Sequence, residues 1–530
     1  MRPASLAIVT AWLCCVTVYA QTSYTWTGGG GNNNWSTGGN WSGGNAPPNP
    51  QAILHFAGTT NTNTNNNLGA YGSGFQIYFD SGAGAFTLNG NPINFYNYGN
   101  NAPTIENDST TLQTISLSQI DTENSMSLYA KSGSMKFTSP FYLDNSTTLT
   151  INAASGNIIT MSGTINNGSG STGTVVLAGS GITVFDAANT YTGQTQINAG
   201  ELQISSNGGI SSSSAIYLGN GSTQTTAAQI TLANSAGGQT FANSFTVNPG
   251  SGGLYRVISA NNTTGTTNTY SGNITLNGDA NLQNTGGGTT EFSGQITTNS
   301  GKYINGSGGT VLLDGSADNT NIGLNVNSGT VILGKASSSS VHAVGSAVNI
   351  NSGGTLQLGG TGGDQIYNGA GVTMNGGTFK PAGHSEGTGS TSVQGTVVTG
   401  TSTNGMATLT LSSNSTLDYT GGAATLTFLG LSDPGNKVLD ITNYTNTTEN
   451  VTLQKSGMDG VDDRLIFDQN EASNLSDFSF NGIAATEINL GNGYYEIVPV
   501  PEPSTWVGAV LAVAAIGFTQ RRRIVRLARS

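Results

Sequence analysis

The segment VNSGTVIL at residues 326–333 recurs as NINSGGTLQL at 349–358 and as MNGGTF at 374–379, and an earlier copy reads QINAGELQI at 196–204. Each copy contains a short strand, an Asn-x-Gly turn and a second strand in which Thr and aliphatic residues alternate. Alternation with a period of two gives a strand one inward and one outward face, and Asn and Gly adopt the positive φ angles of tight turns. The pattern therefore predicts pairs of short strands joined by tight turns.

The pattern returns at a constant interval, because Asn327, Asn351 and Asn375 are spaced by 24 residues each time. A period of about 20 to 30 residues built from short strands is typical of solenoids, whose units bury apolar surface only by stacking. Long helical patterns are absent from this part of the sequence. We therefore predict an all-β fold, a parallel β-helix or solenoid with capping strands at its ends.

The composition excludes several other classes of protein. Only 8% of the 530 residues are charged, 78 are Gly, and the formal net charge is −12. A nucleic-acid partner is not expected, because such proteins need a basic face to replace counterions. A hydrophobic fraction of 35% argues against a disordered acidic chain. The bulk of Gly, Asn, Ser and Thr also argues against a helical bundle.

One copy of the pattern is richer than the others. GTVVL at 173–177 is followed by ANTYTG at 188–193 and by INAGEL at 197–202. This unit is similar to the autotransporter-associated β-strand repeat. A degraded copy at 309–331 retains Asp318-Asn319-Thr320 in its middle but lacks the Tyr. The resemblance implies a passenger-type parallel β-helix at the cell surface.

Residues 1–20 are typical of a secretory signal, with a positive charge near the start, a mostly apolar stretch and small residues at its end. We expect an N-terminal signal helix that signal peptidase removes between Ala20 and Gln21. The alternative is a buried N-terminal helix. Cys14 and Cys15 both lie inside the signal. The mature chain is therefore expected to contain no disulfide and no thiolate metal site.

The last segment combines a proline-rich motif, an apolar stretch at 506–519 and an arginine-rich tail at 521–529. We expect a C-terminal transmembrane helix, the alternative being an amphipathic surface helix, with the arginines as a cytoplasmic stop. The order of these parts resembles a PEP-CTERM sorting signal. That resemblance implies an exosortase of the inner membrane that processes the chain near the motif. The motif residues are Val500, Pro501, Glu502, Pro503 and Ser504, and the stop residues are Arg521, Arg522 and Arg523.

These assignments divide the chain into five segments. Residues 1–20 are the signal peptide, and 21–110 form an N-terminal β cap rich in Trp, Asn and Gly. Residues 111–460 form the β-solenoid with degenerate repeats, 461–498 are closing strands, and 499–530 carry the sorting signal. Caps are expected at both ends because a solenoid must hide its open core.

Three tryptophans of the N-terminal segment are candidates for carbohydrate stacking. Trp26, Trp35 and Trp41 lie among Gly and Asn, and a flat aromatic face can pack on a pyranose ring. The alternative is that they close the end of the solenoid, where each ring would bury about 150 to 250 Å².

Hydrolysis of a glycan needs two carboxylates about 5 to 10 Å apart. Asp314 with Asp318, and Asp462 with Asp463, are the candidate pairs. We interpret both as surface or corner carboxylates, and neighbours on a strand would in any case point to opposite faces.

The three histidines, His55, His342 and His384, lack metal-ligand spacing, and we interpret them as solvated loop residues. We accordingly predict no catalytic residue, no metal and no cofactor. A different result, three or more carboxylates and a Lys or Arg converging in a groove on one face, would indicate an enzyme instead.

The sequence as a whole predicts an exported, non-enzymatic surface or matrix protein. Without Arg2 and the five C-terminal arginines, nine basic residues stand against 27 acidic ones. Such a surface does not suit acidic polymers or anionic membranes as partners. We expect an inner-membrane-anchored precursor and a mature form at the cell surface or outside the cell, with exopolysaccharide or surface matrix as the partner. The alternative is a polysaccharide lyase or hydrolase on a β-helix scaffold.

Overall fold

The computed structural model describes residues 22–500, apart from 50–51, 70–71, 74, 98–100, 145, 222–225, 251–255, 300, 339, 388–405, 446–461 and 492. The expected signal helix and transmembrane helix lie outside these residues. The helices that are described are short 3-10 turns, namely η1 (Gly38–Asn40), η2 (Ser42–Gly44) and η3 (Leu475–Asp477). Over the described ranges, no helix is long and apolar enough to cross a membrane.

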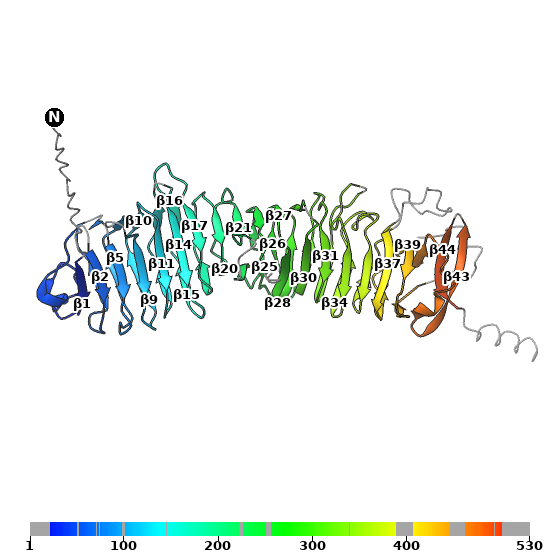
Figure 1. The fold of residues 1–530 in the computed structure, drawn as a ribbon, viewed down its shortest axis with the longest axis horizontal. Helices are drawn as coiled ribbons and strands as arrows, with labels where there is room; N and C mark the ends of the chain where they lie inside the picture. Colours follow the sequence, from blue (N-terminus) through cyan, green and yellow to red (C-terminus); the bar gives the residue numbers. More distant parts are fainter. Residues whose placement is uncertain are drawn as a thin grey trace, which may run out of the picture. The chain divides into compact units, whose positions relative to one another are not determined.

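The chain forms two compact units that divide after Gly173. In the first unit, the short strands of successive coils stack on one another (Figure 1) and pair in parallel, which forms three faces. The first face contains β1 (Ser23–Trp26), β2 (Ala52–Phe56), β5 (Phe75–Phe79), β8 (Thr104–Asn107), β11 (Met126–Ala130) and β14 (Thr148–Ala153). The second contains β3 (Asn63–Asn66), β6 (Thr87–Gly90), β9 (Gln113–Leu117), β12 (Met135–Phe137) and β15 (Ile158–Met161). The third contains β4 (Gly72–Ser73), β7 (Ile93–Phe95), β10 (Ile120–Thr122), β13 (Phe141–Leu143) and β16 (Ile165–Asn167).

The core of the first unit consists of columns of like residues, because the parallel strands stack in register. Along the first face, one fully buried aliphatic residue lies above another in five successive strands. Alternate residues of each strand point inward, so the period-two pattern becomes a continuous apolar column. The residues of this column are Leu54, Ile77, Ile105, Leu128 and Ile151.

The second unit repeats this parallel construction. One face contains β17 (Thr174–Leu177), β19 (Thr195–Ile197), β21 (Ile216–Leu218), β24 (Phe245–Val247), β27 (Ile274–Leu276) and β29 (Ile296–Thr297). A second stack contains β18 (Ile182–Phe185), β20 (Gly200–Ile204), β22 (Ala228–Leu232) and β25 (Arg256–Ala260), and a third contains β23 (Thr240–Phe241) and β26 (Thr267–Tyr270). Two long strands, β28 (Ala280–Phe292) and β30 (Tyr303–Leu313), each pair with two separate strands of a neighbouring coil.

Beyond β30, two ladders of parallel strands run side by side. The first ladder contains β31 (Gly323–Val326), β33 (Val348–Asn351), β35 (Val372–Asn375), β37 (Met406–Ser413), β39 (Thr425–Ser432) and β41 (Arg464–Phe467). The second contains β32 (Gly329–Leu333), β34 (Gly354–Leu358), β36 (Thr378–Lys380), β38 (Ser415–Asp418), β40 (Leu439–Thr442) and β42 (Phe478–Phe480). This parallel pairing confirms the predicted all-β solenoid.

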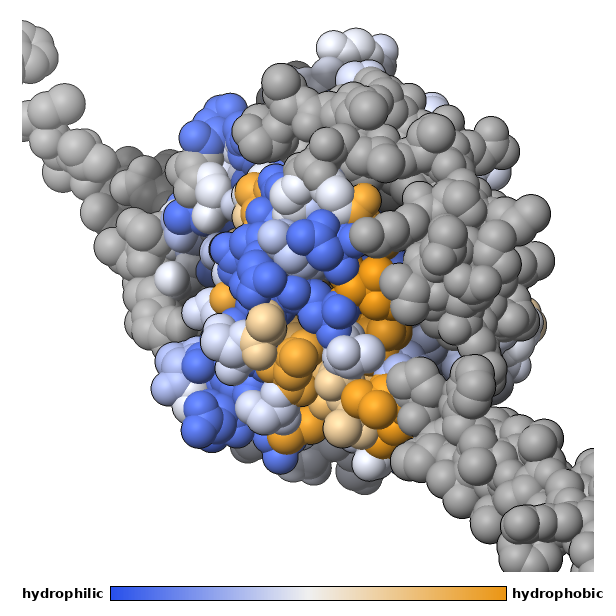
Figure 2. Space-filling view, turned by 90° about the vertical axis from the view of Figure 1, so that its right-hand side faces the viewer, coloured by the Kyte–Doolittle hydropathy of each residue, from blue (hydrophilic) through white to orange (hydrophobic). Residues whose placement is uncertain are grey.

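The last strands change direction. β43 (Ile483–Gly491) and β44 (Tyr494–Pro499) pair antiparallel with each other, and with β42 and β41 respectively. A buried ion pair between Arg464 and Glu496, with a nitrogen–oxygen distance of 3.0 Å, links β41 to β44. An antiparallel hairpin interrupts the parallel repeat, as a terminal cap requires. Figure 2 looks onto this end, where hydrophobic and hydrophilic residues lie next to each other.

The segment boundaries expected from the sequence can be compared with these pairings. Parallel stacking already begins with β1 and β2, well inside the segment 21–110, since the strands there carry the same inward alternation as later ones. The antiparallel strands β43 and β44 span 483–499, so they extend one residue past the expected closing segment 461–498.

Candidate functional site

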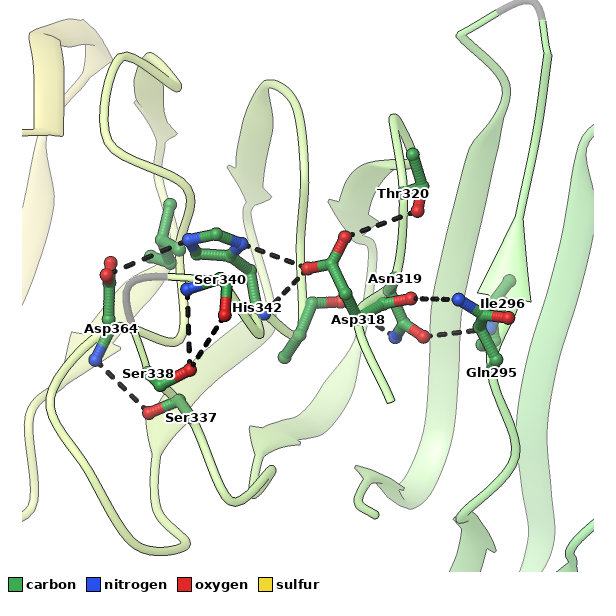
Figure 3. A network of polar contacts seen from close by, with 12 residues as sticks. Gln295, Ile296, Asp318, Asn319, Thr320, Ser337, Ser338, Ser340, His342 and Asp364 are labelled. Atoms are coloured by element: carbon green, nitrogen blue, oxygen red, sulfur yellow. Dashed lines mark hydrogen bonds and ion pairs between the residues drawn. The ribbon is translucent and has the colours of Figure 1, made fainter. Parts of the chain in front are cut away.

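The middle of the second unit contains a cluster of charged side chains from successive coils, Asp318, Lys335, His342, Asp364 and Glu386, which we name the charged cluster. In Figure 3 the His342 ring lies between the carboxylates of Asp318 and Asp364. Its Nδ1 is 3.0 Å from the Asp318 Oδ1, and its Nε2 is 3.7 Å from the Asp364 Oδ2. The backbone N–H of His342 also donates to Asp318. One histidine thus joins the coil before it to the coil after it.

Glu386 lies fully buried in the next coil. Its two carboxylate oxygens accept hydrogen bonds of 3.0 Å from the backbone N–H groups of Gln365 and Ile366. The Gln365 side chain in turn donates to the backbone oxygen of Lys335 and accepts from its N–H. The Lys335 ammonium donates to the backbone oxygen of Asp314 at 2.8 Å. A second series of polar contacts therefore joins the coils that contain Glu386, Gln365 and Lys335.

Burial and neighbouring charges shift the pKa values of three of these groups. Burial raises the pKa of Glu386 to about 8 and lowers the pKa of Lys335 to about 8. The carboxylate of Asp364, and then that of Asp318, raise the pKa of His342. Displaced values of this kind occur in active sites and also in structural ion-pair networks.

The contacts of the charged cluster are those of a structural link. Both ring nitrogens of His342 face carboxylates of the protein, and the Glu386 carboxylate holds two backbone N–H groups. Within the described ranges, no group of three or more His, Cys, Asp or Glu side chains is arranged to hold a metal ion. Three carboxylates and a lysine do converge here, as an enzyme would require, but the depression described next is lined by other residues.

A row of neutral polar side chains follows the outer face of β31, β33, β35 and β37. The Asn351 amide donates to the Asn327 side-chain oxygen at 2.8 Å, and the Asn375 amide donates to that of Asn351 at 3.2 Å. The Ser413 hydroxyl continues the row by donating to Asn375 at 3.0 Å. We name these four residues the asparagine ladder. The spacing of 24 residues in the sequence is thus the length of one coil.

A second row of Asn side chains lies beside the asparagine ladder. The Asn325 amide donates to Asn305, and the Asn349 amide donates to Asn325, each at 2.8 Å. Asn349 and Asn351 are two residues apart in β33, so their side chains leave the same face of the sheet. Asn325 and Asn349 are partly exposed and Asn305 is buried, so the two rows form a polar face that begins at Asn325.

An open depression of about 790 Å³ lies against the asparagine ladder. Its lining is polar or small and contains one charged side chain, that of Lys437. Gly376 in the lining has a φ angle of 87°, which a side chain would strain. The lining residues are Asn351, Ser352, Asn375, Gly376, Ser413, Asn414 and Lys437.

The three candidate tryptophans are buried, with exposures of 0%, 0% and 2% for Trp26, Trp35 and Trp41. Their rings pack edge to face on one another and surround Phe56. The indole nitrogens of Trp35 and Trp41 donate to Thr64 and to a backbone oxygen. The rings therefore close the end of the core, which is the alternative interpretation given for them above, and offer no open face on which a sugar could stack.

The other candidates are dispersed. Asp463 accepts hydrogen bonds from the backbone N–H groups of Ala424 and Thr445, which is a structural contact. Ser385, next to His384, accepts a backbone N–H from Thr425. The prediction that His342 is a solvated loop residue is wrong, because it is only 7% exposed.

Among the predicted processing sites, the structure describes Val500. Val500 is 40% exposed and donates its backbone N–H to Ala484. The remaining motif residues, Pro501, Glu502, Pro503 and Ser504, lie outside the described residues, as do Arg521, Arg522, Arg523, Ala20 and Gln21.

Sequence reasoning missed Lys335, Asp364 and the burial of His342. A signal was present, since Asp318 and His342 are 24 residues apart, the spacing of the asparagine ladder.

One segment matches a known family. Residues 172–204 match the model of the passenger-associated transport repeat. No curated protein and no solved structure matches the chain. In the matched segment β17 pairs in parallel with β19, and β18 with β20.

The Asn and Tyr residues that are typical of this repeat make hydrogen bonds that stabilise the coils. The Asn189 amide donates to the backbone oxygen of Gly209 in the next coil, and the buried Tyr191 hydroxyl bonds to Thr195. In the degraded copy Asn319 likewise donates to Ala343 of the next coil. The repeat and the β-solenoid together suggest a passenger-type β-helix that is exported or located at the cell surface.

Proposed function

We propose that this protein is a non-enzymatic, adhesive component of the cell surface or extracellular matrix, with polysaccharide as its partner. The observation that carries the proposal is the broad neutral face formed by the two ladders of Asn side chains. Amides present donors and acceptors side by side, which is what a surface needs to bind the hydroxyls of a glycan. The passenger-type repeat supports a location where such glycans occur.

Export and retention form the second part of the proposal. Signal peptidase cleaves between Ala20 and Gln21, and an exosortase processes the precursor at the motif Val500–Ser504 while residues 506–519 anchor it in the inner membrane. The folded hairpin supports this arrangement, because β44 ends at Pro499 and Val500, the first residue of the motif, is exposed.

Mass spectrometry of the mature C-terminus, in cell-surface and secreted fractions of the producing cells, tests this sorting. A chain that ends near Pro503 and lacks the arginine tail is the expected result. An intact Ser530 in a membrane fraction would contradict exosortase processing and indicate a permanently anchored protein.

A polysaccharide lyase or hydrolase is the second candidate. The observation that favours it is the Asp318–His342 pair, whose carboxylate is 32% exposed while its imidazole is held in place. Release of reducing ends or unsaturated sugars from matrix polysaccharide, abolished in His342→Asn, would establish this function in place of the first.

A further inference from the structure

The depression beside the asparagine ladder has the features of a built binding site. Of the residues that line it, Asn351, Asn375 and Ser413 already hold one another in place through hydrogen bonds of 3.2 and 3.0 Å along the ladder. A ligand would therefore meet side chains whose orientation is fixed before binding, which reduces the entropy lost on association.

The ladder leaves hydrogen-bonding capacity unused. A side-chain amide has two N–H donors and an oxygen with two lone pairs. Asn351 uses one N–H on Asn327 and one lone pair on Asn375, and Asn375 likewise uses one of each. Among the described residues, no further partner of these two amides is found, so each presents one donor and one acceptor outward.

The repeat of the ladder suits a polymer. Neighbouring parallel strands lie about 4.8 Å apart, which is close to the length of one pyranose residue in an extended glycan. Each coil would therefore meet one sugar residue, if the glycan lies along the direction in which the coils stack. The amides all donate in the same direction, from the later coil to the earlier one, and such aligned hydrogen bonds polarise one another.

The charges select the type of glycan. No carboxylate lines the depression, and the single cation, Lys437, has no ion-pair partner in the part of the chain that the structure describes. The chain as a whole has 27 acidic residues against 15 basic ones, which opposes the approach of a polyanion. The Lys437 ammonium can therefore donate hydrogen bonds to sugar oxygens of a neutral chain.

We infer that the depression formed by Asn351, Asn375, Ser413 and Lys437 binds an extended strand of a neutral polysaccharide, one sugar residue per coil. This inference rests on the proposed function and specifies its ligand and its residues.

Affinity electrophoresis and calorimetry of the purified protein test the inference with three neutral probes, soluble β-glucan, mannan and galactan, and with polygalacturonate as the charged probe. We expect binding to at least one neutral probe and none to polygalacturonate. The double variant Asn351→Ala/Asn375→Ala should weaken binding about ten-fold, since it removes about 1.4 kcal/mol or more of hydrogen bonding.

Two further variants separate loss of binding from loss of folding. Asn63→Ala removes a comparable exposed amide contact, the bond that Asn89 donates in the first unit, and should leave the affinity unchanged. Lys437→Gln alters a partly exposed side chain and should weaken binding by a factor of about three with an unchanged melting temperature.

Equal affinity of the wild type and the double variant would overturn the inference. So would preferential binding of polygalacturonate, or no binding of any neutral probe. A mature protein that is processed and found at the surface but binds none of them would refute this site alone, whereas an unprocessed protein in the membrane would refute the proposed sorting.

Discussion

In the second unit, the asparagine ladder and the charged cluster both join successive coils, but with opposite chemistry. The ladder uses neutral, largely exposed amides, and each amide keeps a donor and an acceptor directed to solvent. In the charged cluster, by contrast, the His342 ring lies between two carboxylates, with a hydrogen bond to Asp318 and a 3.7 Å ion-pair contact to Asp364. Glu386 is fully buried and accepts hydrogen bonds from two backbone N–H groups.

This difference separates two tasks that a solenoid must perform. Buried ionisable groups are costly to leave without partners, so they favour one register of the coils over others. Exposed amides contribute little to stability, because water competes for every bond. They remain free to bind a ligand for the same reason. The comparison predicts that substitutions in the charged cluster change stability and its pH dependence, whereas substitutions in the ladder change mainly binding.

The largest effect is expected for Glu386→Ala. The variant leaves the backbone N–H groups of Gln365 and Ile366 buried without acceptors, at a cost of about 2 to 4 kcal/mol of unfolding free energy. Glu386→Gln is the matched control, because its amide oxygen can accept one of the two bonds and should recover about half of the loss. Urea unfolding followed by circular dichroism measures both. If the two variants were equally stable, the two bonds would not be the reason for the loss.

The second prediction concerns pH. Glu386 has a pKa of about 8 in the folded chain and an ordinary value of 4.5, and it faces Asp364 and His342. Between pH 4.5 and 8 the unfolded chain loses this proton while the folded chain keeps it, so stability falls as pH rises. The raised pKa of His342, which faces Asp318 and Asp364, acts in the same direction above pH 6.5.

Unfolding midpoints at pH 5, 6, 7 and 8 test this prediction. The advantage of the wild type over Glu386→Gln should shrink steadily towards pH 8, because only the wild type titrates at this position. Parallel curves for the two proteins would show that Glu386 is ionised in the folded state throughout this range.

Lys335→Met should have a smaller effect at neutral pH. The substitution removes a buried charge, which is favourable, and also the hydrogen bond to Asp314, which is not. The two contributions offset each other to within about 1 kcal/mol. The pKa of Lys335 is about 8 in the folded chain against an ordinary 10.5, so the wild type should gain stability between pH 8 and 10.5 while the unfolded chain keeps its proton. The variant should lack this gain when both are unfolded in urea at these pH values.

The sequence predicts the ladder but not the charged cluster, for a physical reason. The same position of the Asn-x-Gly turn is occupied by Asn327, Asn351 and Asn375. Because they are equally spaced in the sequence, their side chains stack on one another in successive coils. The spacing changes to 38 residues between Asn375 and Ser413, and only the folded chain shows that Ser413 continues the row.

The charged residues lie outside the repeated strand pattern. Asp364 and Glu386 follow His342 at 22-residue steps, in turns whose course depends on packing rather than on alternation. The three tryptophans likewise could not be assigned from the sequence, because Trp residues among Gly and Asn are equally compatible with a sugar-binding surface and with a buried core. Their burial in the folded chain distinguishes the two.

The smallest effects are expected in the ladder itself, where Asn351→Asp and Asn327→Asp form a matched pair. The first substitution removes the donor to Asn327 and places two acceptor oxygens face to face, at a cost of about 1 kcal/mol. The second keeps the acceptor that Asn351 needs, so this variant should lie within about 0.5 kcal/mol of the wild type. Both substitutions add one negative charge at a partly or fully exposed position, which removes net charge as an explanation. Thermal unfolding at pH 7 compares them, and at pH 3 the protonated carboxyl of the Asn351→Asp variant can donate again, so the difference should disappear. Equal losses at pH 7 would mean that the amide bonds do not orient the ladder, and the affinity for a glycan would then have to come from elsewhere on the polar face.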